Sequence, residues 1–156
     1  MRFSAPAVLT AAVLLALPAQ AGAFVQIDRG IAGARIGNTQ AQVKTALGNP
    51  RLTKTGSNDF GDYTLFYYEG GLRVTFQGNT KVTSVTTSGL GDRTSKGVGV
   101  GSTENTVKTK VPGVTCESFG STRSCHTGDF SAGSRVTDFL IKSGKVTRVT
   151  VGIVID

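Results

Sequence analysis

The segment KVTSVTT, residues 81–87, returns as KVTRVTV at residues 145–151. The two segments agree at five of seven positions and lie 64 residues apart in a chain of 156 residues. Self-similarity at a fixed displacement is the signature of a repeated structural unit. A true repeat should align other segments at the same displacement.

A second pair of segments shows the same displacement. IGNTQAQVKTAL at 36–47 aligns with VGSTENTVKTKV at 100–111, and Gly37, Thr39, Val43, Lys44 and Thr45 return as Gly101, Thr103, Val107, Lys108 and Thr109. Coincidence in a Gly/Thr/Val-rich chain would explain either match, but poorly explains a shared displacement. We therefore expect two repeats, at residues 28–90 and 100–156, joined by a glycine-rich linker at 91–99.

The N-terminal residues predict a cleaved secretory signal. Arg2 is followed by the apolar run AVLTAAVLLAL (7–17) and by two small-x-small sites that end at Ala21 and Ala23. The run is too short to span a bilayer, and this order is typical of an export signal. We expect residues 1–23 to be the signal peptide, cleaved after Ala21 or Ala23, and no transmembrane span in the mature protein. The expected location is extracytoplasmic: secreted, periplasmic or in the cell envelope.

Export to an oxidising compartment would allow the two cysteines to form a disulfide. Cys116 and Cys125 allow one pairing in an oxidising compartment, and closing this small loop stabilises a fold by about 2.5–3 kcal/mol. Two free thiols are the alternative. No metal site is expected, because these cysteines and the single histidine, His126, fall short of a closed zinc shell.

The charge favours anionic partners. The net charge is +7, but the basic residues are scattered and form no stripe, so a solvated basic surface is the simpler interpretation. Nucleic-acid binding is not expected for an exported chain without a recognisable motif.

Helix signals occur at the same place in both repeats. Asn38 or Thr39 can cap a helix that ends at Gly48, with Gln42 in capping-box register. Ser102 or Thr103 can cap the second helix, which ends before Pro112. Both helices are short, so we expect them to depend on packing against a sheet.

Strand signals fill the rest of each repeat. Residues 63–68, 72–76 and 81–87 predict an antiparallel meander, and a strand near 121–126 precedes those at 135–141 and 145–155. Alternation predicts Val74 and Phe76 inward and Arg73 and Thr75 outward. It likewise places Val146 and Arg148 outward on the last strand.

No catalytic constellation emerges, so we expect no enzyme and no cofactor. Asp59 and Asp62 in DFGD are explained by turn formation, and the kinase-like reading of this motif lacks every companion motif. GVGVGS at 97–102 lacks the spacing and the lysine of a phosphate-binding loop. A deep pocket around Asp59, Asp62 and His126 would revive the enzyme hypothesis.

The string IGNTQAQVKTALGNP (36–50) resembles the small periplasmic domain family that includes the outer-membrane assembly lipoprotein BamE (SmpA/OmlA). Two such units in tandem, with disulfide support, resemble the β-lactamase inhibitory protein family. The resemblance implies an α+β fold with two tandem helix-loop-helix plus three- to four-stranded antiparallel sheet units that form a saddle. The chain lacks the tryptophans and the first-half disulfide of the inhibitor family, and it lacks the lipid-anchor cysteine of the BamE-like family.

The resemblance also implies a non-catalytic binding surface. It would place partner contacts on Arg73, Thr75, Thr137 and Arg148, with aromatic help from Tyr67 or Tyr68. Tyrosine and arginine are enriched at interfaces, although core packing is an equal alternative for any one tyrosine. The leading hypothesis is an extracytoplasmic protein-binding module, such as an enzyme inhibitor. The alternative is an envelope component that binds anionic wall or membrane surfaces.

Overall fold

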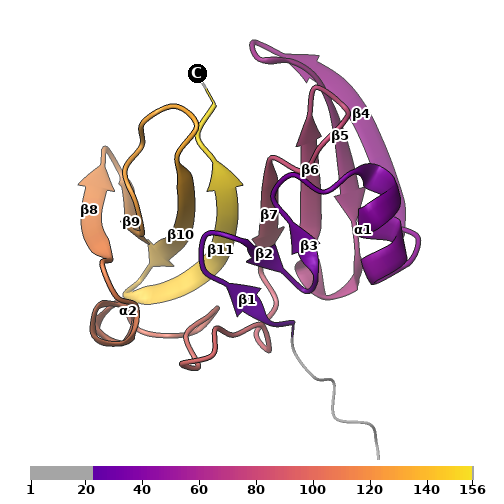
Figure 1. Cartoon of the computed structure of the whole chain (residues 1–156). Helices are drawn as coiled ribbons and strands as arrows, with labels where there is room; N and C mark the ends of the chain where they lie inside the picture. Colours follow the sequence, from indigo (N-terminus) through magenta and orange to yellow (C-terminus); the bar gives the residue numbers. More distant parts are fainter. Residues whose placement is uncertain (1–22, 156) are drawn as a thin grey trace, which may run out of the picture.

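Within residues 23–155, which the computed structural model describes, an eight-stranded antiparallel sheet carries a small three-stranded sheet and two short helices (Figure 1). The predicted signal peptide lies outside these residues apart from Ala23.

The elements fall into two sets on either side of residue 90. The first set is β1 (Val25–Gln26), β2 (Gly30–Ile31), β3 (Ala34–Arg35), α1 (Gln40–Leu47), β4 (Leu52–Asn58), β5 (Gly61–Tyr67), a 3-10 turn (Glu69–Gly71), β6 (Arg73–Gln77) and β7 (Ser84–Thr87). The second set is α2 (Glu104–Lys110), β8 (Thr115–Phe119), β9 (Thr122–His126), β10 (Arg135–Lys142) and β11 (Lys145–Ile153).

The two repeated segments form the centre of the large sheet. Its strand order is β4-β5-β6-β7-β11-β10-β9-β8, so β7 and β11 are neighbours. Thr86 lies directly opposite Thr150, its equivalent 64 residues later, and Val85 lies opposite Val151. A residue that pairs with its own repeat equivalent marks a local two-fold relationship between the halves.

Both helices begin and pack as the sequence predicted. The Thr39 hydroxyl accepts a hydrogen bond from the Gln42 amide at 3.3 Å, and the Gln42 side chain accepts one from the Thr39 amide at 2.8 Å. In α2 the Thr103 hydroxyl accepts from the Thr106 amide at 3.1 Å. Val43 and Val107 are fully buried, so packing on the sheet holds both helices.

The turn before each helix is also repeated. The Gly37 amide donates to the Val82 carbonyl at 2.9 Å, and the Gly101 amide donates to the Val146 carbonyl at 2.7 Å. Both glycines have a φ of 87°, which side-chain-bearing residues rarely adopt. The glycine therefore recurs because the turn requires it.

The expected fold class is wrong. Residues 23–155 do not form two tandem helix-loop-helix units, each with its own sheet. Each half supplies one short helix, and the strands of both halves merge into one sheet. Pairing β7 with β11 removes an exposed edge from each half and gives both halves one continuous apolar face.

Three sets of strands were not predicted from the sequence. The edge strand β4 is almost wholly exposed, so its sequence LTKTGSN carries no apolar alternation. The edge strand β8 lies in the segment that the sequence analysis treated as a disulfide loop, and it forms a hairpin with β9. The strands β1 to β3 are two residues each, too short for any period to appear.

The inward and outward faces that alternation predicted for the strands are correct, except near the end of the chain. Val74, Phe76, Val149 and Val151 are fully buried, as alternation predicted. Val146 was expected outward but is buried, because the pairing of β10 with β11 shifts register between Leu140 and Ile141. A bulge reverses the alternation of the residues beyond it.

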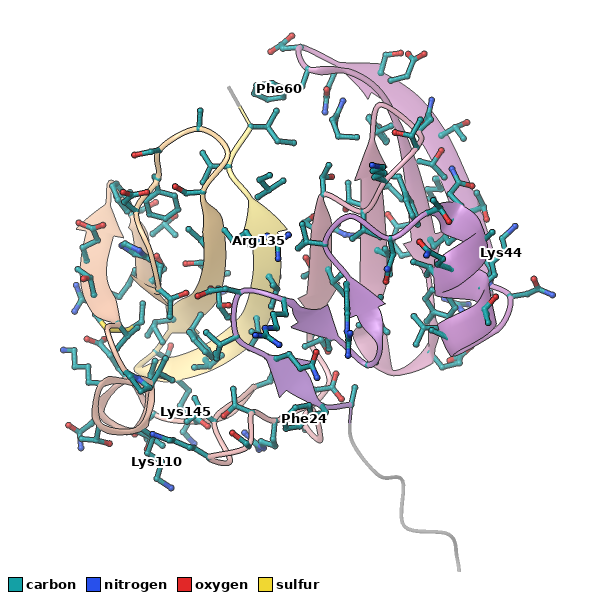
Figure 2. The ribbon with its side chains drawn as sticks, in the orientation of Figure 1. Phe24, Lys44, Phe60, Lys110, Arg135 and Lys145 are labelled. Carbon is teal, nitrogen blue, oxygen red and sulfur yellow. A yellow bond between two sulfur atoms is a disulfide. The ribbon has the colours of Figure 1, made fainter. Side chains whose placement is uncertain are left out.

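One face of the large sheet carries the core. The apolar residues of both halves form one cluster with those of the small sheet and the helices, including Ile31, Val43 and Val107. The small sheet contacts both central strands, through β2. Lys110 on α2, labelled in Figure 2, is exposed, whereas the Lys44 ammonium group on α1 lies 5.3 Å from the ring centre of the buried Phe66. The two helices and the small sheet cover the core face, so the opposite face of the large sheet is free to carry a site.

Candidate functional site on the uncovered sheet face

A single register row crosses all eight strands on the face opposite the core. Each residue of the row lies directly opposite the next, and the row reads Leu52, Tyr67, Arg73, Thr86, Thr150, Asp138, His126 and Thr115. Paired residues of an antiparallel sheet project to the same side. The middle of this face is therefore polar and charged.

The centre of the row is a hydroxyl pair. The Thr86 and Thr150 hydroxyl oxygens are 3.2 Å apart. Arg73 on β6 and Asp138 on β10 flank this pair at equivalent positions, one cationic and one acidic. Among the described residues, buried side-chain polar atoms without a hydrogen-bond partner are found on these two residues, Arg73 Nε and Asp138 Oδ1. Unpartnered buried polar atoms are uncommon and often mark functional positions.

A hollow of about 520 Å³ opens on the first-half side of this centre. Its walls come from β5, β6, β7, β10 and β11 and from the 3-10 turn before β6. The charged and hydroxyl-bearing residues that line it are Arg51, Tyr67, Tyr68, Glu69, Arg73, Thr86, Ser88, Thr147 and Arg148. Leu72 and Leu140 add apolar surface. Such a volume lies within the usual range of ligand sites.

The arginines of the hollow differ in their partners. The Arg51 Nε lies 3.2 Å from a Glu69 carboxylate oxygen, and both side chains are mostly exposed. Within residues 23–155, Arg73 and Arg148 take part in no ion pair. The hollow thus has an excess of positive charge available to a ligand.

Burial raises the pKa of Asp138, against the opposing effects of a hydrogen bond with Ser124 and of the charges of His126 and Arg148. Asp138 does not line the hollow and makes no ion pair with Arg148. The charge of Arg148 therefore acts on Asp138 without a direct ion pair between the two side chains.

His126 lies next to Thr115, which is the second-half end of the row. Its Nε2 lies 2.7 Å from a Glu117 carboxylate oxygen, and its Nδ1 lies 3.2 Å from the Gly128 carbonyl oxygen. The Phe130 ring covers it at 4.5 Å between centroids. The buried position and this covering explain His126 as a packed strand-end residue.

The hypothetical pocket of Asp59, Asp62 and His126 does not form. Asp59 and Asp62 lie at the hairpin between the edge strand β4 and β5, beside Phe60 at its tip (Figure 2), whereas His126 is on β9 near the other edge. The turn interpretation of DFGD agrees with this, because the Ser57 hydroxyl donates to Asp62 at 2.5 Å beside the turn.

Four of the six residues expected to contact a partner meet at the hollow: Tyr67, Tyr68, Arg73 and Arg148. Thr75 lies two residues from Arg73 on the same face and lines a neighbouring hollow of about 330 Å³. Alternation along the strands had placed Arg73 and Arg148 outward, whereas Tyr67 and Tyr68 had been named only through the family resemblance.

The orientation expected for Thr137 is wrong. Thr137 is fully buried on the core side, where its hydroxyl donates to an Asp28 carboxylate oxygen at 2.8 Å. The RVT of 135–137 looks equivalent to the RVT of 73–75, but the strand pairing makes Asp138 the equivalent of Arg73. The two alignments differ by three residues, and any odd shift reverses the face of a strand.

Sequence reasoning also missed several lining residues, chiefly Arg51, Thr86 and Thr147. Thr86 carried a usable signal, because it lies next to Val85, the repeat equivalent of Val149, which alternation had placed inward. Arg51 and Thr147 carried no such signal, since a turn before β4 brings Arg51 to the hollow and the bulge in β11 brings Thr147 there.

The predicted disulfide between Cys116 and Cys125 is confirmed, and it joins directly opposite residues of β8 and β9. Disulfides persist in oxidising compartments, so this bond supports an extracytoplasmic location. The two sulfurs and Glu104 lie within 4.8 Å of one another, but oxidised sulfurs offer no thiolate to a metal. Glu104 is also held by Arg123 and Lys108.

No protein-family model and no curated protein match the chain. Three solved structures resemble it. An extracellular protein containing a SCP domain from Bacillus anthracis str. Ames has a TM-score of 0.51 at 12% identity, over 76% of this chain and 44% of that one. A DUF4309 family protein from Bacillus subtilis has a TM-score of 0.46 at 16% identity, over 78% and 82%. A cysteine-rich secretory protein from Staphylococcus aureus has a TM-score of 0.48 at 9% identity, over 76% and 44%.

These likenesses correct the family resemblance. The first of these structures is neither a BamE-like domain nor a β-lactamase inhibitory protein, so that prediction is wrong. The string that suggested it encodes a helix cap, one buried valine and a glycine stop, which unrelated folds share. The first structure, of which the chain spans less than half, shares its sheet-rich fold with this protein.

Across residues 23–155, no helix has the length and apolarity needed to cross a membrane.

Proposed function

We propose that the chain is a non-catalytic, extracytoplasmic binding module that holds a partner protein on the uncovered face of its large sheet. The observation that carries the proposal is the convergence of Tyr67, Tyr68, Arg73 and Arg148 on one hollow at the middle of that face. Tyrosine and arginine are the residues that most often carry binding energy at the centre of an interface.

The composition of the face supports a protein partner. Tyr63, Leu65 and Tyr67 alternate along β5 with Arg73 and Thr75 opposite on β6, and all are partly exposed. Aromatic and aliphatic surface beside arginine is typical of interface centres, whereas a face of lysines would favour polyanions.

Site-directed photo-crosslinking tests this proposal. A photoreactive residue in place of Leu65 on the uncovered face is compared with one in place of Thr109 on the exposed side of α2. The tagged chain is exported by its own cell, and the crosslinked products are identified by mass spectrometry. We expect a protein crosslinked specifically from position 65. The same products from both positions, or none from position 65, would contradict the proposal.

The identity of the captured protein decides what form the binding takes. An extracytoplasmic enzyme that loses activity on binding would make the chain an inhibitor. A periplasmic, wall or membrane protein would give the finer location.

A second candidate is binding to anionic wall or membrane polymers, which the net charge of +7 favours. Electrostatic binding of this kind weakens steeply as salt rises, because exposed charges are screened within about 8 Å at physiological ionic strength. Co-sedimentation with isolated envelopes at about 50 and 500 mM salt separates the candidates, because a complex built on apolar and aromatic contacts persists at the higher salt.

A further inference from the structure

We infer that the hollow at Arg73 and Arg148 is a binding site for a carboxylate attached to an aromatic or aliphatic body. This deepens the proposed function and rests on it, since such a group on the partner would be the anchor of the complex. Aspartate, glutamate and a C-terminal carboxylate are the groups by which a protein would present it.

The register of the central strands places Arg73 and Arg148 on either side of Thr86. Arg73 lies directly opposite Thr86 on the neighbouring strand. Arg148 is two residues from Thr150, which lies opposite Thr86 on the other side. Diagonal neighbours in a sheet are about 7–8 Å apart, within reach of long side chains. Two guanidinium groups can therefore approach one ligand above the Thr86 hydroxyl.

The charge around this point is unbalanced. Arg51 is paired with Glu69 at the edge of the hollow, while Arg73 and Arg148 make no ion pair in the part of the chain that the structure describes. Arg73 Nε is buried and without a hydrogen-bond partner there. Guanidinium groups bind carboxylates through paired hydrogen bonds, so a carboxylate is a matching ligand.

The walls favour a ligand with an apolar body over a small inorganic anion. Leu72, Leu140 and the rings of Tyr67 and Tyr68 surround the charged centre. The volume of about 520 Å³ is far larger than a bare phosphate needs and suits a side chain of a partner or a small organic acid. The shared chemistry is a carboxylate beside apolar surface, and the source is decided by experiment.

The test is an NMR titration of the exported, disulfide-bonded chain, labelled with ¹⁵N, with defined probes. One arm uses 3-phenylpropionate and its neutral amide. The second arm uses the capped pentapeptide acetyl-Ala-Phe-Glu-Phe-Ala-amide and its Gln analogue, and a third uses inorganic phosphate. We expect each carboxylate probe to bind at least tenfold more tightly than its neutral analogue and to shift signals of Arg73, Thr86 and Arg148.

Matched variants assign the binding to the two arginines. Arg73→Gln and Arg148→Gln should each weaken the carboxylate probes by tenfold or more. Arg135→Gln is the control, because Arg135, labelled in Figure 2, is exposed, carries the same charge and is not among the residues that line the hollow. Urea unfolding checks that all three variants remain folded.

Each outcome has a defined meaning. Binding of both carboxylate probes, or of the peptide alone, supports the inference with a protein source. Binding of 3-phenylpropionate alone supports the site with a small-molecule source and weakens the proposed function. Equal binding of neutral analogues or phosphate, or an equal loss in Arg135→Gln, overturns the inference. A partner crosslinked from position 65 whose binding is unchanged in both arginine variants would overturn it while leaving the proposed function intact.

Discussion

Thr86 and Thr150 face each other at the middle of the sheet, with hydroxyl oxygens 3.2 Å apart and 64 residues between them in the chain. They are equivalent positions of the two repeated segments, so the local two-fold relationship between the halves passes between these side chains. Both the core beneath them and the arginine hollow beside them are organised around this contact.

The threonine pair itself gives the first prediction. Thr150→Val removes one hydroxyl and leaves the buried Thr86 hydroxyl without this partner, so we expect a loss of about 1–2 kcal/mol in unfolding free energy. Thr86→Val/Thr150→Val removes both groups and should recover most of that loss. Urea unfolding of the four members of the cycle measures the coupling. Simple additivity of the single variants would mean that the hydroxyls do not interact.

The equivalence of the helices predicts equal sensitivity at Val43 and Val107. Both side chains are fully buried, so Val43→Ala and Val107→Ala should each destabilise the protein by roughly 1.5–3 kcal/mol. Lys110→Ala, on the exposed side of α2, is the control and should change little. Loss at one valine only, with the other unaffected, would show that the two helices are not equivalent in the fold.

The attachment of the N-terminal hairpin to the second half depends on Asp28. Its carboxylate accepts hydrogen bonds from the Thr127 hydroxyl at 2.5 Å and the Thr137 hydroxyl at 2.8 Å. Its φ of 56° is one that Asp and Asn tolerate better than Ala. We expect Asp28→Ala to cost about 2–3 kcal/mol and Asp28→Asn clearly less, as measured by urea unfolding. Equal losses would show that neither the backbone conformation nor an oxygen acceptor matters there.

The acid sensitivity of the second half should depend on Glu104. Hydrogen bonds from Arg123 and then Lys108 lower the pKa of Glu104 from 4.5 to about 2. A carboxyl group whose folded pKa is depressed contributes stability that is complete above its unfolded pKa and disappears as pH falls through its folded pKa. Glu104→Gln should therefore be less stable than the parent chain at pH 6, and the difference should vanish between pH 4.5 and 2.

Thermal unfolding across this pH range measures the effect. Glu69→Gln, at the exposed pair with Arg51, is the control and should leave the profile nearly unchanged. A difference between Glu104→Gln and the parent that persists undiminished at pH 2 would exclude this carboxyl group as its cause.

The contacts of Ala23 bear on the two expected signal-cleavage sites. Its amide donates to a carboxylate oxygen of the buried Asp92 at 2.6 Å, and its carbonyl accepts from the Arg93 amide at 3.0 Å. A chain that begins at Gly22 keeps both contacts, whereas one that begins at Phe24 loses both. We expect the longer chain to be more stable by about 1–2 kcal/mol and to be the exported form. Urea unfolding of both chains and mass spectrometry of the exported protein give the answer.

Local features of the fold were readable from the sequence because they depend on neighbouring residues. A threonine cap with Gln42 three residues later, a glycine at φ 87° and a disulfide within ten residues need no knowledge of the rest of the chain. The outward positions of Arg73 and Arg148 were found in the same way, since alternation along a strand defines its faces.

What the sequence by itself determined is the repeated unit: its helix starts and stops, its apolar alternation, its one disulfide and the outward arginines at 73 and 148. The tertiary structure alone decided that β7 pairs with β11 and that polar edge strands complete the sheet. It also decided that a bulge near Leu140 buries Val146, and that Asp138 rather than Thr137 lies on the uncovered face. The physical reason is that strand pairing is made by backbone groups common to every residue, so the partner and the register follow from the packing of the whole chain rather than from any one segment.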